Sequence, residues 1–288
     1  MIQLNHDNYF STEAALDYMS VSQYKRFMEC EARALAEIRG EWVRKKSEAL
    51  IFGSYVDFAL TEPEGFAPFC MKEGKMIYTK TTWKNGQGDP AKFKKFAYII
   101  KADEVIACLR ADELAMRFLS GEAQPILTGE INGIMWKGKL DILLDTCFVD
   151  LKTARTLGKV WCKVLMPDGG KPRNVELDWY EERNYWLQLA VYQELLRQKI
   201  GKQLVPCILA VSKEDPPDKD FIAFDNQHRL DQELEFNIKN AQRYTDIKNG
   251  KVEPTAIDCD YCRSVKKLTY KTARSAIGFD ENGMRRVW

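Results

Sequence analysis

Histidine is nearly absent from this 288-residue sequence, in which His6 and His228 are the only two. A catalytic triad with a histidine base, or a metal centre built from several histidines, is therefore not expected. The sequence also lacks an apolar run long enough to cross a membrane, and its first residues, MIQLNHDNYFSTEAA, do not resemble a secretory signal. We therefore expect a cytoplasmic protein with no membrane partner.

Net charge is also nearly absent, because 43 lysines and arginines offset 42 acidic residues. A neutral total does not indicate a nucleic-acid binder, although an enzyme can gather carboxylates at its centre and basic groups around it. The eight cysteines are scattered, apart from Cys259 and Cys262, and without an export signal we expect reduced thiols. Chemistry that uses carboxylates and a metal ion remains open.

The order of the expected elements indicates the fold class. Helices are predicted first, then strands over 125–153, and then helix, strands and helix, which is typical of an α/β or α+β domain with helices covering a sheet. We expect one domain over 1–288, with a core at about 20–263 and an irregular tail at 264–288. The predicted elements are helices at 20–38 (capped by Ser20 or Ser22), 44–60, 91–119 (broken near 110–112), 178–199 and 230–248, a three-stranded antiparallel meander over 125–153, a mobile loop at 155–175, and strands at 205–211 and 221–224.

The most informative stretch runs from Glu130 to Lys152. Residues 148–152 read as a strand, so Asp150 and Lys152 share one face. A turn at Asp145-Thr146 would bring Asp141 beside Asp150. Two close carboxylates repel unless a cation lies between them, and hard divalent ions bind through carboxylates, water and phosphate oxygens. With a lysine beside them, this arrangement suits hydrolysis of a phosphodiester.

Each of these features also has a simpler explanation. An isolated D-x8-D-x-K match is more commonly two solvated hairpin carboxylates with a paired lysine. Gly53 within a helix indicates close approach by another backbone or a ligand, and tight helix packing explains it equally well. Gln188 and Tyr192 share the face of helix 178–199 that also carries Tyr185. They could hydrogen-bond phosphate or a metal-bound water, or simply belong to a core-facing stripe.

Taken together, the motifs resemble a known family. A helix with Glu48 and GSYVD is followed by GE at 129–130, LD at 140–141, VDLKT at 149–153 and QLAVYQ at 188–193. This order is similar to the PD-(D/E)XK nuclease superfamily, especially its phage-type exodeoxyribonuclease VIII-like (RecE-like) branch, related to the RecB nuclease domain. The resemblance covers about 20–263. It implies a restriction-endonuclease-like core, in which helices flank a central mixed sheet with an antiparallel meander.

The resemblance also implies roles for individual residues. Asp141 and Asp150 match the metal-binding carboxylates and Lys152 the catalytic lysine, while Leu140 replaces the proline of the family name. Gln188 and Tyr192 match the catalytic Q-x3-Y motif. Further metal-binding positions would be Glu130 and Asp57, the latter standing where many relatives have a histidine and therefore unable to supply an imidazole. Contacts to the DNA backbone are expected from Lys25, Arg26, Arg33 and Ser54.

The resemblance implies a Mg²⁺-dependent exonuclease, with Mn²⁺ as a substitute, that digests linear duplex DNA 5′ to 3′ in phage or prophage recombination. A homo-oligomer and a single-strand annealing partner would accompany it. The alternatives are a Cas4-like or repair nuclease acting on single strands, and a non-catalytic DNA-binding scaffold with the same fold.

Some relatives hold an iron–sulfur cluster with one early cysteine and three late ones. This chain has Cys30, Cys259 and Cys262, and Ala256 cannot act as a ligand. An iron–sulfur cluster is therefore not expected. We expect two free thiols at Cys259 and Cys262, and a zinc site is the alternative.

Overall fold

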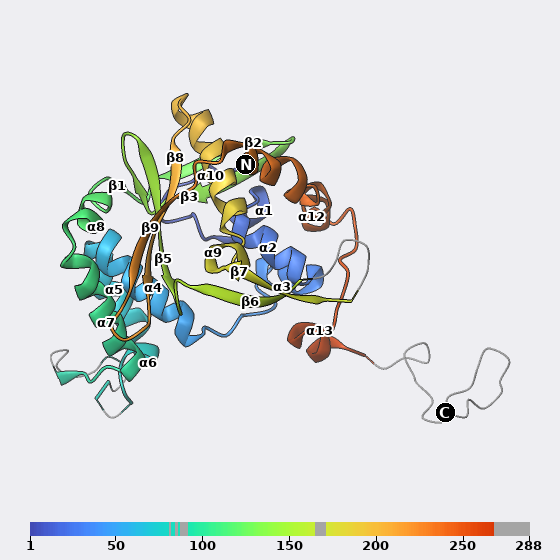
Figure 1. Ribbon diagram of the computed structural model, residues 1–288. Helices are drawn as coiled ribbons and strands as arrows, with labels where there is room; N and C mark the ends of the chain where they lie inside the picture. The colour runs from blue at the N-terminus through green and yellow to red at the C-terminus, as the bar shows by residue number, and fades with distance from the viewer. Residues whose placement is uncertain (81, 84–85, 87–91, 165–170, 268–288) are drawn as a thin grey trace.

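The structure is a computed structural model that describes residues 1–80, 82–83, 86, 92–164 and 171–267 (Figure 1). Most of the irregular tail predicted at 264–288 therefore lies outside the described residues, as do residues 165–170 of the predicted loop. No helix in the part of the chain described here is long and apolar enough to cross a bilayer.

A five-stranded mixed sheet forms the centre of the molecule. Its order is β1-β4-β5-β8-β9, in which β5 and β8 run parallel and the other neighbours run antiparallel. Two antiparallel hairpins, β2–β3 and β6–β7, make separate ladders. The strands are β1 (Glu122–Ala123), β2 (Ile126–Ile131), β3 (Ile134–Lys139), β4 (Ile142–Leu143), β5 (Cys147–Ala154), β6 (Lys159–Val164), β7 (Arg173–Asp178), β8 (Val205–Ser212) and β9 (Lys219–Ala223).

Helices cover both faces of this sheet (Figure 1). The side chains of β5 and β8 alternate between two hydrophobic clusters: Phe148 belongs to the first cluster, and Val149 and Leu151 belong to the second. The second cluster is completed by α4 (Glu48–Thr61), α5 (Pro63–Lys72), α6 (Gly74–Ile77), α7 (Ala97–Arg110) and α8 (Glu113–Phe118). The remaining helices are α1 (Thr12–Asp17), α2 (Val21–Glu29), α3 (Glu31–Ile38), α9 (Trp179–Glu182), α10 (Tyr185–Ile200), α11 (Gln227–Gln232), a π-helical turn (Glu233–Asn237), α12 (Ala241–Lys248) and α13 (Asp260–Val265).

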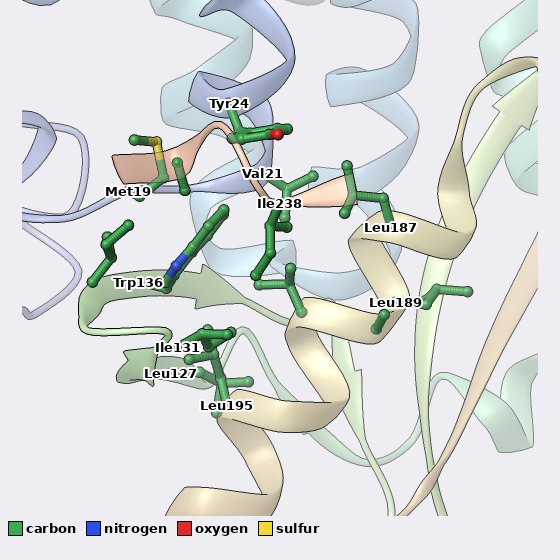
Figure 2. Close-up of a cluster of buried hydrophobic side chains, with 14 of the residues drawn as sticks. Met19, Val21, Tyr24, Leu127, Ile131, Trp136, Leu187, Leu189, Leu195 and Ile238 are labelled. Atoms are coloured by element: carbon green, nitrogen blue, oxygen red, sulfur yellow. The ribbon is translucent and has the colours of Figure 1, made fainter. Parts of the chain in front are cut away.

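The first cluster joins the hairpin β2–β3 to the helices around it. Figure 2 shows Trp136 of β3 in this cluster with Met19, Tyr24 and Leu195. Trp136 is fully buried, and its ring centroid lies 5.9 Å from that of Tyr24. An indole of this size contributes a large apolar area to the core. It thereby fixes the hairpin that leads into Asp141.

The predicted fold class, a mixed sheet with helices on both faces, is confirmed. The predicted meander differs, because β2 and β3 form their own ladder and do not belong to the central sheet, where β4 lies between β1 and β5. The loop prediction at 155–175 was wrong over β6 and β7. The sequence KVWCKV alternates in the way a strand does, but the flanking glycines and proline favoured a loop.

Three predicted long helices are interrupted. The helix predicted at 230–248 is divided into the end of α11, the π-helical turn and α12, with residues 238–240 outside any helix. Ser20 caps α2 as predicted, its Oγ accepting the N–H of Gln23 at 3.3 Å. Cys30 then adopts an extended backbone, with φ −168° and ψ 112°, and separates α2 from α3. Asn184, at φ 52°, separates α9 from α10. Asparagine is among the few residues that adopt this left-handed conformation at low cost.

Two lysine ammonium groups lie in the interior beside α1 and α2. Lys248 Nζ donates to the carbonyl of Tyr18 at 2.8 Å and to Gln23 Oε1 at 3.2 Å. Lys137 Nζ donates to the carbonyl of Tyr9 at 2.6 Å. Burial, with a smaller contribution from the charge of Lys137, lowers the pKa of Lys248 to about 7, and burial lowers the pKa of Lys137 to about 8.

These buried lysines predict a stability that increases with pH. Above pH 7 the folded protein releases a proton from Lys248 while the unfolded chain keeps it up to about pH 10.5, so the free energy of unfolding should increase by up to about 1.4 kcal/mol per pH unit for this group. Urea unfolding between pH 6.5 and 9 measures this slope. Lys248→Met should flatten it, whereas Lys251→Met, at an exposed position, should not. A slope unchanged by Lys248→Met would contradict the assignment.

Candidate active site

Asp141 and Asp150 face each other across the β4–β5 hairpin. Ile142 pairs with Val149, and continuing this antiparallel register by one residue places Asp141 opposite Asp150. Asp141 Oδ2 also accepts the backbone N–H of Leu151 at 2.7 Å. The hairpin therefore brings the two carboxylates together as the sequence predicts.

Asp150 is buried in a polar arrangement with one acceptor left over. It is 2% exposed, and its Oδ1 accepts the side-chain amide of Gln188 at 3.0 Å. Its Oδ2 lies 2.5 Å from Lys152 Nζ in an ion pair, but this oxygen accepts no hydrogen bond of good geometry. The Lys152 ammonium therefore balances the charge of this buried carboxylate.

The pKa values of Asp141, Asp57 and Lys152 are shifted by the negative charges that lie close together here. Burial raises the pKa of Asp141 well above its usual value, and the charges of Asp150 and Asp57 raise it further. Burial likewise raises the pKa of Asp57, which is opposed by its hydrogen bond from Thr61 and by the charge of Lys152. Burial alone would lower the pKa of Lys152, but the charges of Asp150 and Asp141 outweigh it and raise this pKa. Lys152 therefore remains protonated beside three carboxyl groups.

One face of α10, with Gln188 at its centre, lies beside Asp150 and Lys152. Tyr185 lies three residues before Gln188, and the Lys152 ammonium is 5.3 Å from its ring centroid. Tyr192 lies four residues after Gln188, and burial raises the pKa of its hydroxyl well above the usual value. Gly138 lets this ring approach β3, because a Cβ at that position would come within 2.9 Å of the Tyr192 ring.

Two cavities are each lined by a tyrosine of this α10 face. One, of about 360 Å³, is lined by Tyr192 together with Lys139 and Arg26. The other, of about 670 Å³, is lined by Tyr185 and by Thr153, the residue after Lys152. Gln188 lies between Tyr185 and Tyr192 along α10 and donates to Asp150, but neither Gln188 nor the carboxylates of the site line either cavity. The larger cavity is also lined by Arg155, Arg183, Lys213, Trp161 and Trp179.

Lys25 lies close to the carboxylate group. Its Nζ donates to the backbone carbonyls of Arg183 at 3.0 Å and Asn184 at 2.9 Å, and so links α2 to the start of α10. Burial and the charge of Lys152, partly offset by Asp150, lower the pKa of Lys25 to about 8. The structure thus brings Lys25 to the site, with its donors used by the backbone.

The other three predicted DNA contacts differ in their positions. Arg26 lines the smaller cavity, with its guanidinium 3.5 Å from a carboxylate oxygen of Glu37. Arg33 is paired with Glu29 at 2.5 Å and with Glu37 at 3.6 Å, so its charge is already matched. Ser54 is half-buried on α4, next to Gly53, whose added Cβ would be 3.6 Å from Thr153 Oγ1.

Glu130 is not brought to the carboxylate group. It pairs with Met135 beside the Asn132-Gly133 turn, whereas Asp141 follows the opposite end of the same hairpin, where Ile126 pairs with Lys139. Four residues of strand separate Glu130 from Ile126, which is a distance of about 13 Å. The side chain of Glu130 is exposed, and it is not among the charges that affect Asp141.

Comparison with known proteins identifies the family of this fold and site. Residues 20–265 match the family described as a PDDEXK-like domain of unknown function. The chain belongs to this PDDEXK-like family. A solved structure of a putative exonuclease from Eubacterium rectale is 32% identical, with a TM-score of 0.80, and the match covers 93% of this chain and 96% of that chain. These two matches support a nuclease.

Two other comparisons add less. The solved structure of SSO0001 is 14% identical over 83% of this chain and 96% of that chain. Its TM-score of 0.27 does not indicate a shared fold. No curated protein shows a significant match to the sequence.

Sequence reasoning missed some residues around the site of this PDDEXK-like domain. Lys139 lines the smaller cavity, its ammonium is 3.6 Å from Glu62, and its charge acts on Asp57. Its position two residues before Asp141 was the available signal, because side chains two apart along a strand share a face. Tyr185 was recognised as part of the helical stripe, but not as a neighbour of Lys152.

The residues of the PDDEXK-like site fit a hard divalent cation. Asp141, Asp150 and Asp57 supply only oxygen donors, which hard divalent cations prefer. Among the described residues their oxygens are not all within 4.8 Å of one another, and the Lys152 ammonium lies 2.5 Å from Asp150 Oδ2, so one or two of these carboxylates together with water would hold the ion. Mg²⁺ and Mn²⁺ are the ions that prefer such donors.

Proposed function

We propose that this chain is a metal-dependent DNA exonuclease that hydrolyses linear duplex DNA from its ends, in the 5′ to 3′ direction, during phage or prophage recombination. The observation that carries the proposal is the convergence of Asp141, Asp150 and Lys152, two buried carboxylates and an ammonium, at one place on the sheet. The similarity to a putative exonuclease supports attack from DNA ends. The direction and the recombination role follow from the RecE-like resemblance.

The surroundings of the site suit a DNA strand. Arg155, Arg183 and Lys213 line the larger cavity and would contact phosphates without reading sequence. Trp161 is 72% exposed in the same cavity and offers a flat surface on which a base can stack. A strand held in this cavity would lie beside Thr153, the residue after Lys152.

Each side chain of the site would have a separate role in the reaction. Asp141 and Asp150, with Asp57 beside them, would hold a divalent cation, which supplies charge neutralisation at the phosphate and a more acidic water. Lys152 carries a proton, so it would orient the attacking water or stabilise the developing negative charge rather than act as a base. Gln188 holds Asp150 in position. Tyr192 keeps its proton and can donate to a phosphate oxygen.

Digestion of end-labelled DNA tests this proposal. With Mg²⁺ or Mn²⁺, the protein should release nucleotides from the 5′ end of a linear duplex and leave a 3′ single-stranded tail, while a closed circle stays intact. Chelation by EDTA should stop the reaction. Faster digestion of single strands than of duplex would favour the repair-type alternative. Binding to DNA without cleavage under any divalent cation would favour the scaffold.

A further inference from the structure

Three cysteine sulfurs from distant parts of the chain meet beside α3. The Sγ of Cys30 lies 3.6 Å from the Sγ of Cys259 and 3.6 Å from that of Cys262. All three sulfurs lie within 4.8 Å of one another, and none forms a disulfide. Cys30 is 229 and 232 residues from its two partners along the chain. A cluster of thiols at these separations is the arrangement expected around a thiophilic metal ion.

The backbone conformation at Cys30 and Cys259 brings the three sulfurs together. Cys30 has an extended conformation that ends α2 and starts α3, although the surrounding sequence favours a continuous helix. Cys259 is the N-cap of α13, and its Sγ accepts the N–H of Cys262 at 3.5 Å. A C-x2-C turn with an N–H directed at the first sulfur holds both sulfurs on one side of the chain.

The segment that carries Cys259 and Cys262 has little apolar packing of its own. α13 is six residues long and has no buried residue, and a helix of this length is not stable by itself. Tyr261 contacts Trp42 edge-to-face at a centroid distance of 5.7 Å. Short elements without a core of their own are commonly fastened by a disulfide or a metal ion.

We infer that Cys30, Cys259 and Cys262 bind one Zn²⁺ ion, which fastens α13 to the junction of α2 and α3. Tetrahedral thiolates at about 2.3 Å from zinc have sulfurs about 3.8 Å apart, close to the 3.6 Å separations here. In a four-iron cluster each thiolate binds a different iron, which spreads the sulfurs much farther apart. No fourth His, Cys, Asp or Glu ligand atom joins the group within the described ranges. Water or a small anion would therefore complete the coordination.

Metal analysis of the purified full-length protein tests this inference. Wild type, exchanged into buffer with a weak chelator, should retain about one zinc per chain and only background iron. Cys30→Ser and Cys262→Ser should lose the zinc. Cys108→Ser, a half-buried cysteine on α7, should retain it, and so should Asp150→Asn, which separates this ion from any cation at the carboxylates. Zinc below about a tenth of an equivalent in wild type, or iron with sulfide in its place, would overturn the proposal.

Cobalt spectroscopy and proteolysis keep the test decisive if a cysteine variant fails to fold. Wild type reconstituted with Co²⁺ should show thiolate-to-cobalt charge-transfer absorption in the near ultraviolet. Removing the metal with a strong chelator should expose the chain near Val252–Val265 to protease at least 10-fold faster, while the central sheet stays intact. Absence of the cobalt band, or equal cleavage with and without chelator, would show that the three thiols bind no metal.

Discussion

Asp150→Asn should reduce hydrolysis of linear DNA by on the order of 10²- to 10³-fold, which is the range for removing one group that stabilises transition-state charge. The substitution keeps the shape of the side chain and an oxygen for the Gln188 amide, but it removes the charge that faces Lys152 and a bound cation. Initial rates on end-labelled duplex, at saturating Mg²⁺, measure the loss.

Lys152→Met should cause a loss of similar size, and the double variant should be little worse than either single one, because the two groups act as a unit. Asp145→Asn is the matched control, because Asp145 lies exposed on the turn of the same hairpin. It should retain full activity. DNA affinity and melting temperature should be measured for every variant. Activity within threefold of wild type in folded Asp150→Asn would remove this residue from the reaction.

Asp141→Asn should change how stability depends on pH and on divalent cations. The folded-state pKa of Asp141 is raised by burial and by the charges of Asp150 and Asp57, so the folded protein binds this proton more tightly than the unfolded chain. Without metal, the free energy of unfolding should therefore fall as pH increases from about 4 through the folded-state pKa. The asparagine variant should lose this decrease, because it carries no ionisable group at that position.

A divalent cation bound by Asp141 and Asp150 should increase the free energy of unfolding, because it offsets the repulsion between the carboxylates. At 100 times its dissociation constant, a cation that binds only the folded protein adds about 2.7 kcal/mol, which is about 4 to 5 °C of melting temperature for a chain of 288 residues. Wild type should gain this increase with Mn²⁺, Asp141→Asn should gain almost none, and Asp145→Asn should behave as wild type. An equal gain in all three proteins would place the bound cation elsewhere.

Much of the candidate site could be predicted because its distances along the chain are short. The turn at Asp145 sets the register that places Asp141 opposite Asp150, and strand alternation places Lys152 with Asp150. Helical periodicity likewise placed Gln188 and Tyr192 on one face. Such local geometry follows from the period of each element alone.

Glu130 shows where resemblance was a weaker guide than register. The Asn132-Gly133 turn was predicted, and it fixes Glu130 opposite Met135, near the turn. Counting along the hairpin would have placed Glu130 far from Asp141. The metal-binding role of Glu130 was instead taken from the order of the family's motifs, and the order of motifs does not determine the distance between residues.

Other features depend on contacts between distant segments and could not be read from the sequence. The meeting of Cys30 with Cys259 requires the whole chain to fold between them. The interruption at Asn184 places two backbone carbonyls within reach of Lys25, and no local pattern indicates this contact. The parallel pairing of β5 with β8, which buries Asp150 within the sheet, is likewise long-range.

Counting bound Mn²⁺ by electron paramagnetic resonance tests the central claim most directly, namely that Asp141 and Asp150 form a cation site beside Lys152. Wild type, Asp145→Asn and Cys30→Ser should each bind tightly at least one Mn²⁺ per chain, whereas Asp141→Asn and Asp150→Asn should lose this binding. Equal Mn²⁺ binding by all five proteins, or none by wild type with or without DNA, would contradict the account.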